Sequence, residues 1–355
     1  MTGDRETGIS KQGTGDREQE TTKVFTNSYH PAPSPQSSVP SFSFIIPVKP
    51  GGYVSALEAL RRIDASAFCF EVLVAEGMTP SQQRNQAAYQ SQGDYIYFLD
   101  DDSQLPADAL PWCLAAFEDR TVAIVGGPSL TPPGDSVLQQ LFGLALSSLF
   151  GAGGVRNRYR AVGLPRETTE KELILCNMVF RRENFAGFGG FDERLYPNEE
   201  NELMDRIHAA GHRLVHVPEM AVYRSQRPTM KAFMRQMFAY GRGRAQQTLI
   251  SGVGTLLGFV PLLFVFYLFS LPLGLLWPGW LIPLAAYLLF AMCFAIHAAF
   301  AVGKLCPLAL VAVYPVLHVS NGIGLLCGFI GGRPQPVARG VVTVKQAKTF
   351  EQTEW

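Results

Sequence analysis

The sequence lacks the cysteine pairs that disulfide frameworks and zinc knuckles need. It has 6 cysteines in 355 residues, no two of them form a Cys-x-x-Cys pair, and half lie in or beside one long apolar block. Scattered cysteines of this kind argue against a disulfide-built or zinc-knuckle protein and favour a reducing compartment.

An excess of charge of either sign is also missing. The 30 Lys and Arg residues balance 30 Asp and Glu residues, so the basic surplus expected of a general nucleic-acid binder is absent. We therefore predict no nucleic-acid partner. The N-terminal stretch is polar throughout and has no apolar core, which excludes a secretory signal there. Its shortage of large aliphatic residues predicts a disordered tail.

Charge is almost absent from one segment near the C-terminus. Between Ser251 and Ile330 the only Lys, Arg, Asp or Glu residue is Lys304. A membrane-spanning helix needs roughly 20 apolar residues, so this segment has room for two to three spans. We expect breaks near Trp277 and at residues 303–307. Membrane lipids are accordingly predicted partners.

A basic segment with helical spacing precedes the apolar block. Met230, Phe233 and Met237 fall on one helical stripe. The segment contains no acid and is surrounded by the basic residues Arg224, Arg227, Lys231, Arg235, Arg242 and Arg244. This pattern favours a helix lying on an anionic membrane surface. An ordinary helix packed on the domain core is the alternative.

Basic residues at both ends of the apolar block bear on its orientation. Those before it place the preceding domain in the cytoplasm by the positive-inside rule. Arg333, Arg339, Lys345 and Lys348 place the C-terminal tail there too. Three full spans cannot satisfy both placements, so either one segment is re-entrant or the tail breaks the rule.

From Phe42 onward, apolar runs alternate with segments of helical spacing. The runs Phe42–Pro47, Phe70–Ala75, Tyr95–Leu99 and Val122–Val125 consist almost entirely of apolar residues. This alternation is typical of strands that are buried on both faces and joined by helices. The pattern therefore predicts an α/β fold with a mostly parallel sheet.

Three aspartates, Asp100, Asp101 and Asp102, follow directly after the run Tyr95–Leu99. In open parallel sheets ligands bind beyond the carboxyl ends of the strands. Adjacent carboxylates repel one another unless a cation neutralises them, and their oxygens suit Mg²⁺ or Mn²⁺. We therefore predict a Mg²⁺ or Mn²⁺ site that also holds a diphosphate; a solvated acidic turn is the alternative.

Several short motifs occur in a definite order along this region. They are Ile45-Ile-Pro-Val, Gln83-Arg-Asn-Gln-Ala-Ala, Gly93-Asp-Tyr-Ile-Tyr-Phe-Leu-Asp-Asp-Asp, Asn177-Met-Val-Phe-Arg-Arg-Glu, Gly189-Gly-Phe-Asp-Glu-Arg and Asn198-Glu-Glu-Asn-Glu-Leu. In this order they resemble family 2 glycosyltransferases, and most of all the membrane enzymes that build bacterial exopolysaccharide and other surface glycans. The resemblance covers about residues 43–244. It implies a Rossmann-like GT-A domain that binds a nucleotide sugar.

The resemblance also implies roles for individual residues. Asp102, with Asp100, would hold the metal. Glu200, with Glu199 beside it, occupies the position of the general base that deprotonates the acceptor hydroxyl in an inverting transfer. Acids in the first turn of a helix also favour its dipole, which is the alternative reading of this pair. The residues implied to contact the nucleotide sugar are Pro47, Glu76, Arg84, Asp100 and Asp101. Those implied to lie on the acceptor or membrane side are Asn177, Gln236 and Arg242.

Three positions depart from the family pattern. Glu76 stands where paired aspartates are usual, which loosens the assignment of uridine. Glu200 replaces an aspartate and is one methylene longer. Gln236 only echoes the family's Gln-x-x-Arg-Trp motif, which favours transfer of one sugar over processive polymerisation.

The domain organisation expected from these patterns has five parts. They are a disordered polar tail (1–40), a GT-A catalytic domain (41–224), a basic amphipathic interfacial helix (225–249), a transmembrane region of two to three spans (250–331) and a C-terminal tail (332–355). We expect a multi-pass protein of the inner or plasma membrane with its catalytic domain in the cytoplasm.

The expected function is metal-dependent, inverting transfer of a sugar in surface-glycan synthesis. The resemblance implies a nucleotide-sugar donor, UDP-linked, and a lipid-linked or membrane-proximal glycan as the acceptor. The alternatives are a catalytically inactive membrane scaffold of the same fold, and a transporter. The lack of repeated halves argues against a transporter.

Overall fold

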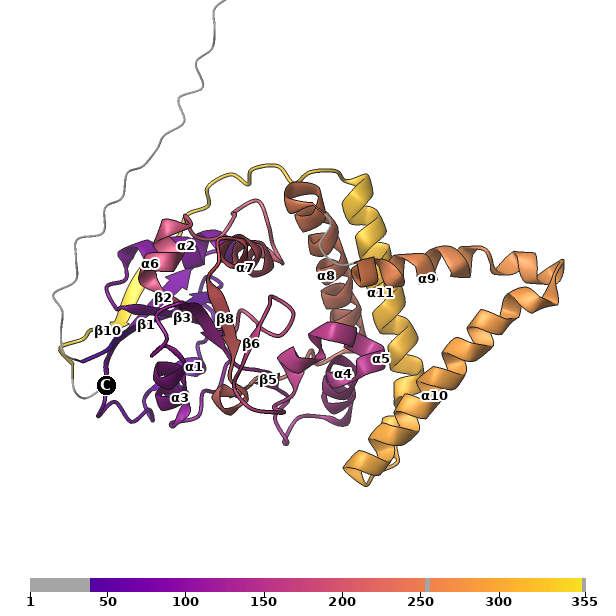
Figure 1. Cartoon of the computed structure of the whole chain (residues 1–355), viewed down its shortest axis with the longest axis horizontal. Coiled ribbons are helices and arrows are strands. Elements are labelled where there is room, and N and C mark those ends of the chain that lie inside the picture. The colour runs from indigo at the N-terminus through magenta and orange to yellow at the C-terminus, as the bar shows by residue number, and fades with distance from the viewer. Residues whose placement is uncertain (1–38, 253–255, 353–355) are drawn as a thin grey trace, which may run out of the picture. The chain divides into compact units, whose positions relative to one another are not determined.

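The computed structural model describes residues 39–252 and 256–352. Its centre is an eight-stranded sheet of order β10-β2-β1-β3-β7-β4-β8-β6 (Figure 1). The strands are β1 (Ser41–Val48), β2 (Cys69–Glu76), β3 (Tyr95–Leu99), β4 (Val122–Gly126), β6 (Arg166–Thr168), β7 (Asn177–Arg181), β8 (Arg213–His216) and β10 (Thr343–Lys348). A separate pair consists of β5 (Ser129–Leu130) and β9 (Val222–Tyr223). Residues 1–38 of the predicted polar tail (1–40) lie outside the described residues.

Five of the eight strands, β1, β2, β3, β4 and β8, point the same way. Strand β1 pairs parallel with β2 and β3, and β4 pairs parallel with β8. Strand β7 lies between β3 and β4 and is antiparallel to both, so β3 and β4 share one direction. The predicted α/β class with a mostly parallel sheet is therefore confirmed. The first strand extends one residue past Pro47, to Val48.

Helices cover both faces of the sheet, as the apolar strands require. The catalytic-domain helices are α1 (Ala56–Leu60), α2 (Pro80–Gln90), α3 (Ala109–Ala116), α4 (Val137–Ser147), α5 (Leu149–Ala152), α6 (Arg182–Gly187) and α7 (Glu199–Ala209). One face packs Phe44 and Tyr97 against α1 and α3. The other packs Ile45 and Phe98 against α2, α6 and α7. Alternate residues of β1 and β3 thus fill two cores, which fixes the strand register.

The C-terminal tail returns to the sheet as its edge strand. β10 pairs antiparallel with β2, and Lys345 Nζ lies 3.1 Å from Glu76 Oε2. Before β10, the backbone near residues 337–342 accepts hydrogen bonds from Gln82 and Gln86 of α2. The sequence analysis assigned no structure to this tail, because edge strands that pair with distant residues have no local signal.

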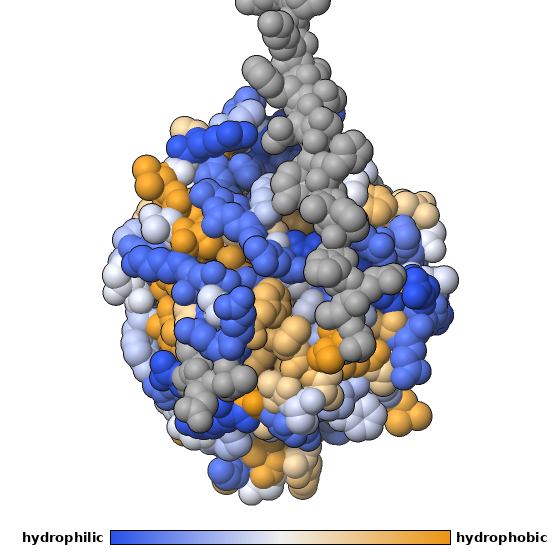
Figure 2. All heavy atoms as spheres, turned by 90° about the vertical axis from the view of Figure 1, so that its left-hand side faces the viewer, coloured by the Kyte–Doolittle hydropathy of each residue, from blue (hydrophilic) through white to orange (hydrophobic). Residues whose placement is uncertain are grey.

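The remaining helices are α8 (Met230–Ser251), α9 (Val260–Phe269), α10 (Ile282–Val302) and α11 (Leu310–Ile330). In the described residues, two helical segments are long and apolar enough to cross a membrane, Pro278–Val302 and Cys306–Ile330, and a bent pair covering 137–159 is a further candidate. In Figure 1, α9 and α10 extend away from the sheet, whereas α11 lies along α8. Figure 2 views the opposite, sheet end, where hydrophilic side chains are interspersed with hydrophobic ones.

Small residues bring α8 and α11 into close contact. A Cβ on Gly241 would lie 2.0 Å from the carbonyl oxygen of Asn321, and one on Gly324 would lie 2.1 Å from that of Phe238. A Cβ on Gly328 would meet Ala245 at 2.6 Å. Phe238 lies beside Gly324, and Ala245, further along α8, lies beside Gly328, further along α11. The two helices therefore run parallel. Such small-residue packing is typical of helices in membranes.

The pairing of β10 with β2 determines which side of a membrane the tail occupies. Since both strands belong to one sheet, the chain between Ser251 and Thr343 must make an even number of complete crossings. Cysteines placed at the exposed Gly134 and Gly340, in a variant whose native cysteines are replaced by alanine, should react from the same side of sealed vesicles. The measurement is labelling by a membrane-impermeant maleimide. Labelling from opposite sides would contradict the shared sheet.

The contact between α8 and α11 should be sensitive to a single methyl group. Gly324→Ala should lower the free energy of unfolding by about 1–3 kcal/mol, because overpacking forces the helices apart. Gly258→Ala is the matched control, since a Cβ there meets nothing within 4 Å. Thermal unfolding in detergent should show a lower Tm for the first variant only. Equal Tm values would mean that the helices do not pack this closely.

Candidate active site

The aspartates after β3 lie at the carboxyl end of the sheet. Tyr97, Phe98 and Leu99 are buried and anchor the strand, so the chain leaves the core at Asp100 in a fixed direction. The side chain of Asp100 is 20% exposed and that of Asp102 is 45% exposed. The carboxylate of Asp100 is therefore mostly enclosed by protein, whereas that of Asp102 is more open to solvent. This is the predicted position, beyond the strand ends.

Arg84 connects this strand end to α7. Its Nη2 lies 2.9 Å from Asp100 Oδ1 and its Nη1 lies 3.0 Å from Glu199 Oε1. The guanidinium is buried, so both hydrogen bonds are charge-assisted and poorly screened. Arg84 is held there by α2, whose first turn begins at Pro80, a residue suited to that position. Arg84 thus pairs with two acids, and its place near the nucleotide stays a prediction.

Arg224 makes a second bridge, which sequence reasoning missed. Its Nη2 lies 3.1 Å from Asp100 Oδ2 and its Nε lies 2.7 Å from Asp102 Oδ1. Sequence analysis counted Arg224 only among the basic residues before the apolar block. It follows β9, a strand of two residues that is too short to leave a recognisable pattern. Contacts in the folded chain alone reveal this role.

These contacts set the protonation of the aspartates. Burial favours the neutral form of Asp100, yet the Arg224 and Arg84 guanidiniums outweigh it and hold its pKa below the usual range. Burial, followed by the charges of Asp102 and Asp100, raises the pKa of Asp101. Asp100 is therefore held as an anion, whereas Asp101 is not stabilised in this way.

The two glutamates at the start of α7 differ in their surroundings. Glu199 is bound by Arg84, while burial and the neighbouring Glu200 raise its pKa to about 8. Glu200 is also buried, at 8% exposure, but within the described residues its carboxylate has no hydrogen bond or ion pair. A carboxylate free of partners is available to accept a proton from a substrate. The two adjacent glutamates therefore differ, because Glu199 is paired with Arg84 and, within the described residues, Glu200 is unpaired.

The helix α8 packs directly against the start of α7. Gln247 Oε1 accepts a hydrogen bond from Asn198 Nδ2 at 3.0 Å, and Gln247 Nε2 donates to Asp205 Oδ2 at 2.9 Å. A Cβ on Gly243 would lie 2.4 Å from the carbonyl oxygen of Pro197. The glutamate pair is thus positioned by the same helix that packs against α11.

The remaining predicted site residues lie in different places. Pro47 lies within β1 beside Ala75, and Glu76, at the end of β2, is bound by Lys345 of the tail. Asn177 is fully buried, accepts from the Tyr97 hydroxyl at 2.6 Å and donates to two backbone carbonyls. Its side chain joins β3, β7 and the segment after β4, and does not face an acceptor.

The two residues predicted from α8 differ in exposure. Gln236 lines a hollow beside Arg224, and its Nε2 donates to Tyr240 Oη at 2.8 Å. Arg242 is exposed, and its backbone passes close to Gly328 of α11. Gln236 thus lies near the aspartates, whereas Arg242 lies on the side of the apolar helices.

The donor set fits a Mg²⁺ or Mn²⁺ ion that is completed by a substrate. No group of three or more His, Cys, Asp or Glu side chains that could hold a metal occurs within the described ranges. Asp102 is accessible, and Mg²⁺ commonly takes one or two carboxylates together with phosphates and water. Arg224 now holds the carboxylates of Asp100 and Asp102 together, as a bridging cation would.

Comparison with known proteins identifies the family of the chain. Residues 95–302 match the family described as "Glycosyl transferase family group 2". The chain is 31% identical over 158 residues to the succinoglycan biosynthesis protein ExoA of Rhizobium meliloti (strain 1021). This match covers 44% of the chain and 45% of that protein, so the chain spans about half the length of its relative.

Solved structures of glycosyltransferases are also similar. The mannosyltransferase PcManGT of Pyrobaculum calidifontis, in complex with GDP-Man and Mn²⁺, has a TM-score of 0.48 and 16% identity, over 84% of this chain and 89% of that one. S. aureus TarS 1–349 in complex with UDP-GlcNAc has a TM-score of 0.41 and 16% identity, over 88% of this chain and 98% of that one. The family match spans more than half of the 355 residues, and the chain therefore belongs to glycosyl transferase family group 2.

Proposed function

We propose that the protein is an inverting, metal-dependent glycosyltransferase that moves one sugar from a nucleotide sugar to a lipid-linked or membrane-proximal acceptor in surface-glycan synthesis. The observation that carries this proposal is the run of alternating charges Glu199–Arg84–Asp100–Arg224–Asp102. This run supports the proposal because it links the acids proposed to hold a metal to Glu199, the neighbour of Glu200 in the chain.

Glu200 is the proposed general base. Inversion requires that the acceptor hydroxyl lose its proton as its oxygen attacks the anomeric carbon from the side opposite the leaving diphosphate. A single carboxylate within hydrogen-bond reach is sufficient, and no covalent intermediate is needed. Glu200 is favoured over Glu199 because Arg84 already engages Glu199. The proton passes from the acceptor oxygen to the Glu200 carboxylate.

Asp102 and Asp100 are the proposed metal ligands. A bound Mg²⁺ or Mn²⁺ would neutralise the diphosphate leaving group. Arg84 holds Asp100 in place, and Pro47 and Glu76 are proposed to border the nucleoside. The pairing of Glu76 with Lys345 adds the tail strand to this border. The donor base and sugar are left open, since Glu76 replaces the family's usual aspartates.

We further propose an inner- or plasma-membrane location with the catalytic domain and the tail both in the cytoplasm. The basic residues on both sides of the apolar block support this placement by the positive-inside rule. The shared sheet supports it too, because it requires an even number of crossings. A hairpin of Pro278–Val302 and Cys306–Ile330 fulfils both conditions.

The metal site can be tested by calorimetric binding of a panel of UDP- and GDP-sugars in Mn²⁺ and in EDTA. Wild-type protein in detergent should bind one donor saturably, and EDTA should abolish the binding. Asp102→Ala should weaken binding in Mn²⁺ by at least about tenfold, which is roughly the worth of one charged contact. Asp108→Ala, an exposed aspartate nearby, is the control and should bind as wild type. Binding of no donor by folded wild-type protein would instead favour an inactive scaffold.

The base can be tested with Glu200→Gln, which keeps the shape of the side chain and removes its charge. Donor affinity should stay within about twofold, while sugar transfer to a membrane lipid extract should fall by about 100-fold or more. Glu183→Gln is the matched control, because Glu183 also lies in the first turn of a helix. Transfer at the wild-type rate by Glu200→Gln would exclude Glu200 as the base.

A further inference from the structure

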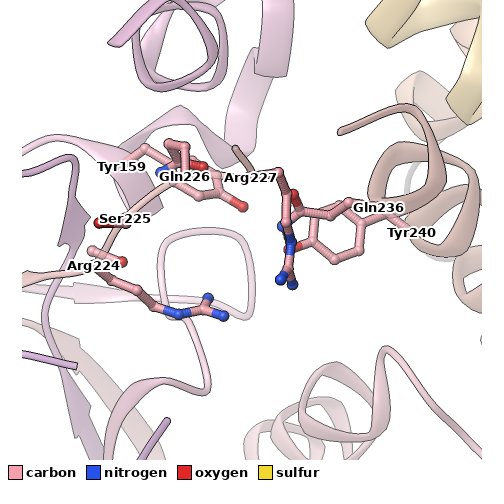
Figure 3. A pocket seen from close by; sticks show the side chains of 8 residues that line it. Tyr159, Arg224, Ser225, Gln226, Arg227, Gln236 and Tyr240 are labelled. Carbon is pink, nitrogen blue, oxygen red and sulfur yellow. Dashed lines mark hydrogen bonds between the residues drawn. The ribbon is translucent and has the colours of Figure 1, made fainter. Parts of the chain in front are cut away.

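Helix α8 faces the catalytic domain with one side along its length. In Figure 3 the side chains of Gln236 and Tyr240 extend from α8 toward the opening that the segment after β9 borders. Gly243 and Gln247 follow one and two turns further along the same side of the helix. A Cβ on Gly243 would lie 2.4 Å from the carbonyl oxygen of Pro197, so α8 meets the backbone that leads into α7.

Gln247 joins two points of α7 by hydrogen bonds. Its Oε1 accepts from Asn198 Nδ2 at 3.0 Å, and its Nε2 donates to Asp205 Oδ2 at 2.9 Å. Burial, followed by the charge of Glu170, raises the pKa of Asp205 to about 6, so at neutral pH this carboxylate can only accept. The Gln247 nitrogen must therefore face Asp205 and its oxygen must face Asn198. One buried side chain thus links the residue that precedes α7 to a residue two turns along it.

The backbone of Asn198 shows what this link holds in place. Its φ of 93° lies in the left-handed region, which asparagine tolerates better than most residues other than glycine. An asparagine before a helix commonly turns its side chain back to accept from the helix N–H groups. The side chain of Asn198 makes no such bond and reaches across to α8 instead. Gln247 therefore stabilises an uncommon backbone conformation immediately before the two glutamates.

The direction of the Glu200 side chain depends on this backbone. Arg84 holds the carboxylate of Glu199, whereas in the described part of the chain the Glu200 carboxylate has no hydrogen bond or ion pair. Its direction is therefore set by the first turn of α7. A general base has to lie within hydrogen-bond reach of its substrate, and a displacement of about 1 Å can lower a rate about 100-fold. A small shift at Asn198 would thus slow proton transfer to Glu200.

We infer that Gln247 is a positioning residue for the proposed base and holds the first turn of α7 so that the Glu200 carboxylate meets the acceptor hydroxyl. The inference rests on the proposed transfer reaction and adds a residue to it that acts through Glu200 without touching the substrate. Because α8 also packs along α11, the helix that precedes the apolar block orients the base.

The test is Gln247→Ala in the full chain in detergent. With the UDP- or GDP-sugar that wild type binds, transfer to a membrane lipid extract should show a kcat lower by about 10- to 100-fold, while calorimetric donor affinity stays within about twofold. Gln246→Ala is the matched control, since no hydrogen bond of the Gln246 side chain occurs among the described residues, and its kcat should equal that of wild type. A lower Tm with an unchanged kcat for Gln247→Ala would mean a structural role only and would overturn the inference.

A reciprocal exchange tests the hydrogen bonds themselves. Gln247→Glu alone sets two carboxylates against each other at Asp205 and, at mildly alkaline pH, should lower kcat as much as Gln247→Ala does. Adding Asp205→Asn moves the amide to α7 and the carboxylate to α8, which keeps an N–H···O bond between the two positions and an acceptor for Asn198. The double variant should recover kcat to within about threefold of wild type. A folded double variant that stays as slow as Gln247→Glu contradicts the inference.

Hydrogen–deuterium exchange separates this inference from the proposed function, because it needs no transfer. Peptides that cover residues 198–205 should exchange at least about fivefold faster in Gln247→Ala than in wild type, and Gln246→Ala should show no change. If wild type transfers no sugar, the proposed function is wrong, and exchange then decides whether Gln247 holds α7. Unchanged exchange in Gln247→Ala overturns the inference in either case.

Discussion

Arg84 is the contact on which the arrangement of the site depends. It is buried between Asp100 and Glu199, which come from β3 and α7. Leaving one member of a buried ion pair without its partner typically costs about 3–5 kcal/mol. The alternating acidic and basic side chains from Glu199 to Asp102 therefore link four separate chain segments: α7, α2, the end of β3 and the residue after β9. Among the residues that the structure describes, the same network leaves Glu200 without a hydrogen bond or ion pair, so the two neighbouring glutamates differ in their surroundings.

A second constraint links this site to the apolar helices. Small residues let α8 and α11 approach closely, while Gln247 and Gly243 of α8 hold the start of α7. The chain then returns from α11 as β10, which binds the end of β2 at Glu76. The apolar region is thus attached to the catalytic domain at both ends. Helix α8 and strand β2 are therefore joined through α11 and β10.

Much of the fold could be predicted from local patterns. Continuous apolar runs predicted the central strands, and the acids after Leu99 predicted the position of the site, because parallel strands end at one edge of a sheet. Three things were missed: the partners of Arg84, the bridge made by Arg224 and the strand β10. Asn177, implied by resemblance to face the acceptor, is buried as a link between strands. Except for the Arg84–Asp100 pair, which joins residues 16 positions apart, each of these depends on residues more than 40 positions apart.

The sequence by itself determined the α/β class, the apolar block and the candidate acids, since burial patterns and charge clusters are local properties of the chain. Tertiary structure decided which glutamate is bound and which is free, because Glu199 and Glu200 are adjacent and chemically identical in sequence. It also decided that the chain returns after the apolar block to the sheet from which it came, and that Arg224 bridges Asp100 and Asp102. These follow from long-range pairing between β10 and β2 and between the residue after β9 and the end of β3, which no local pattern encodes.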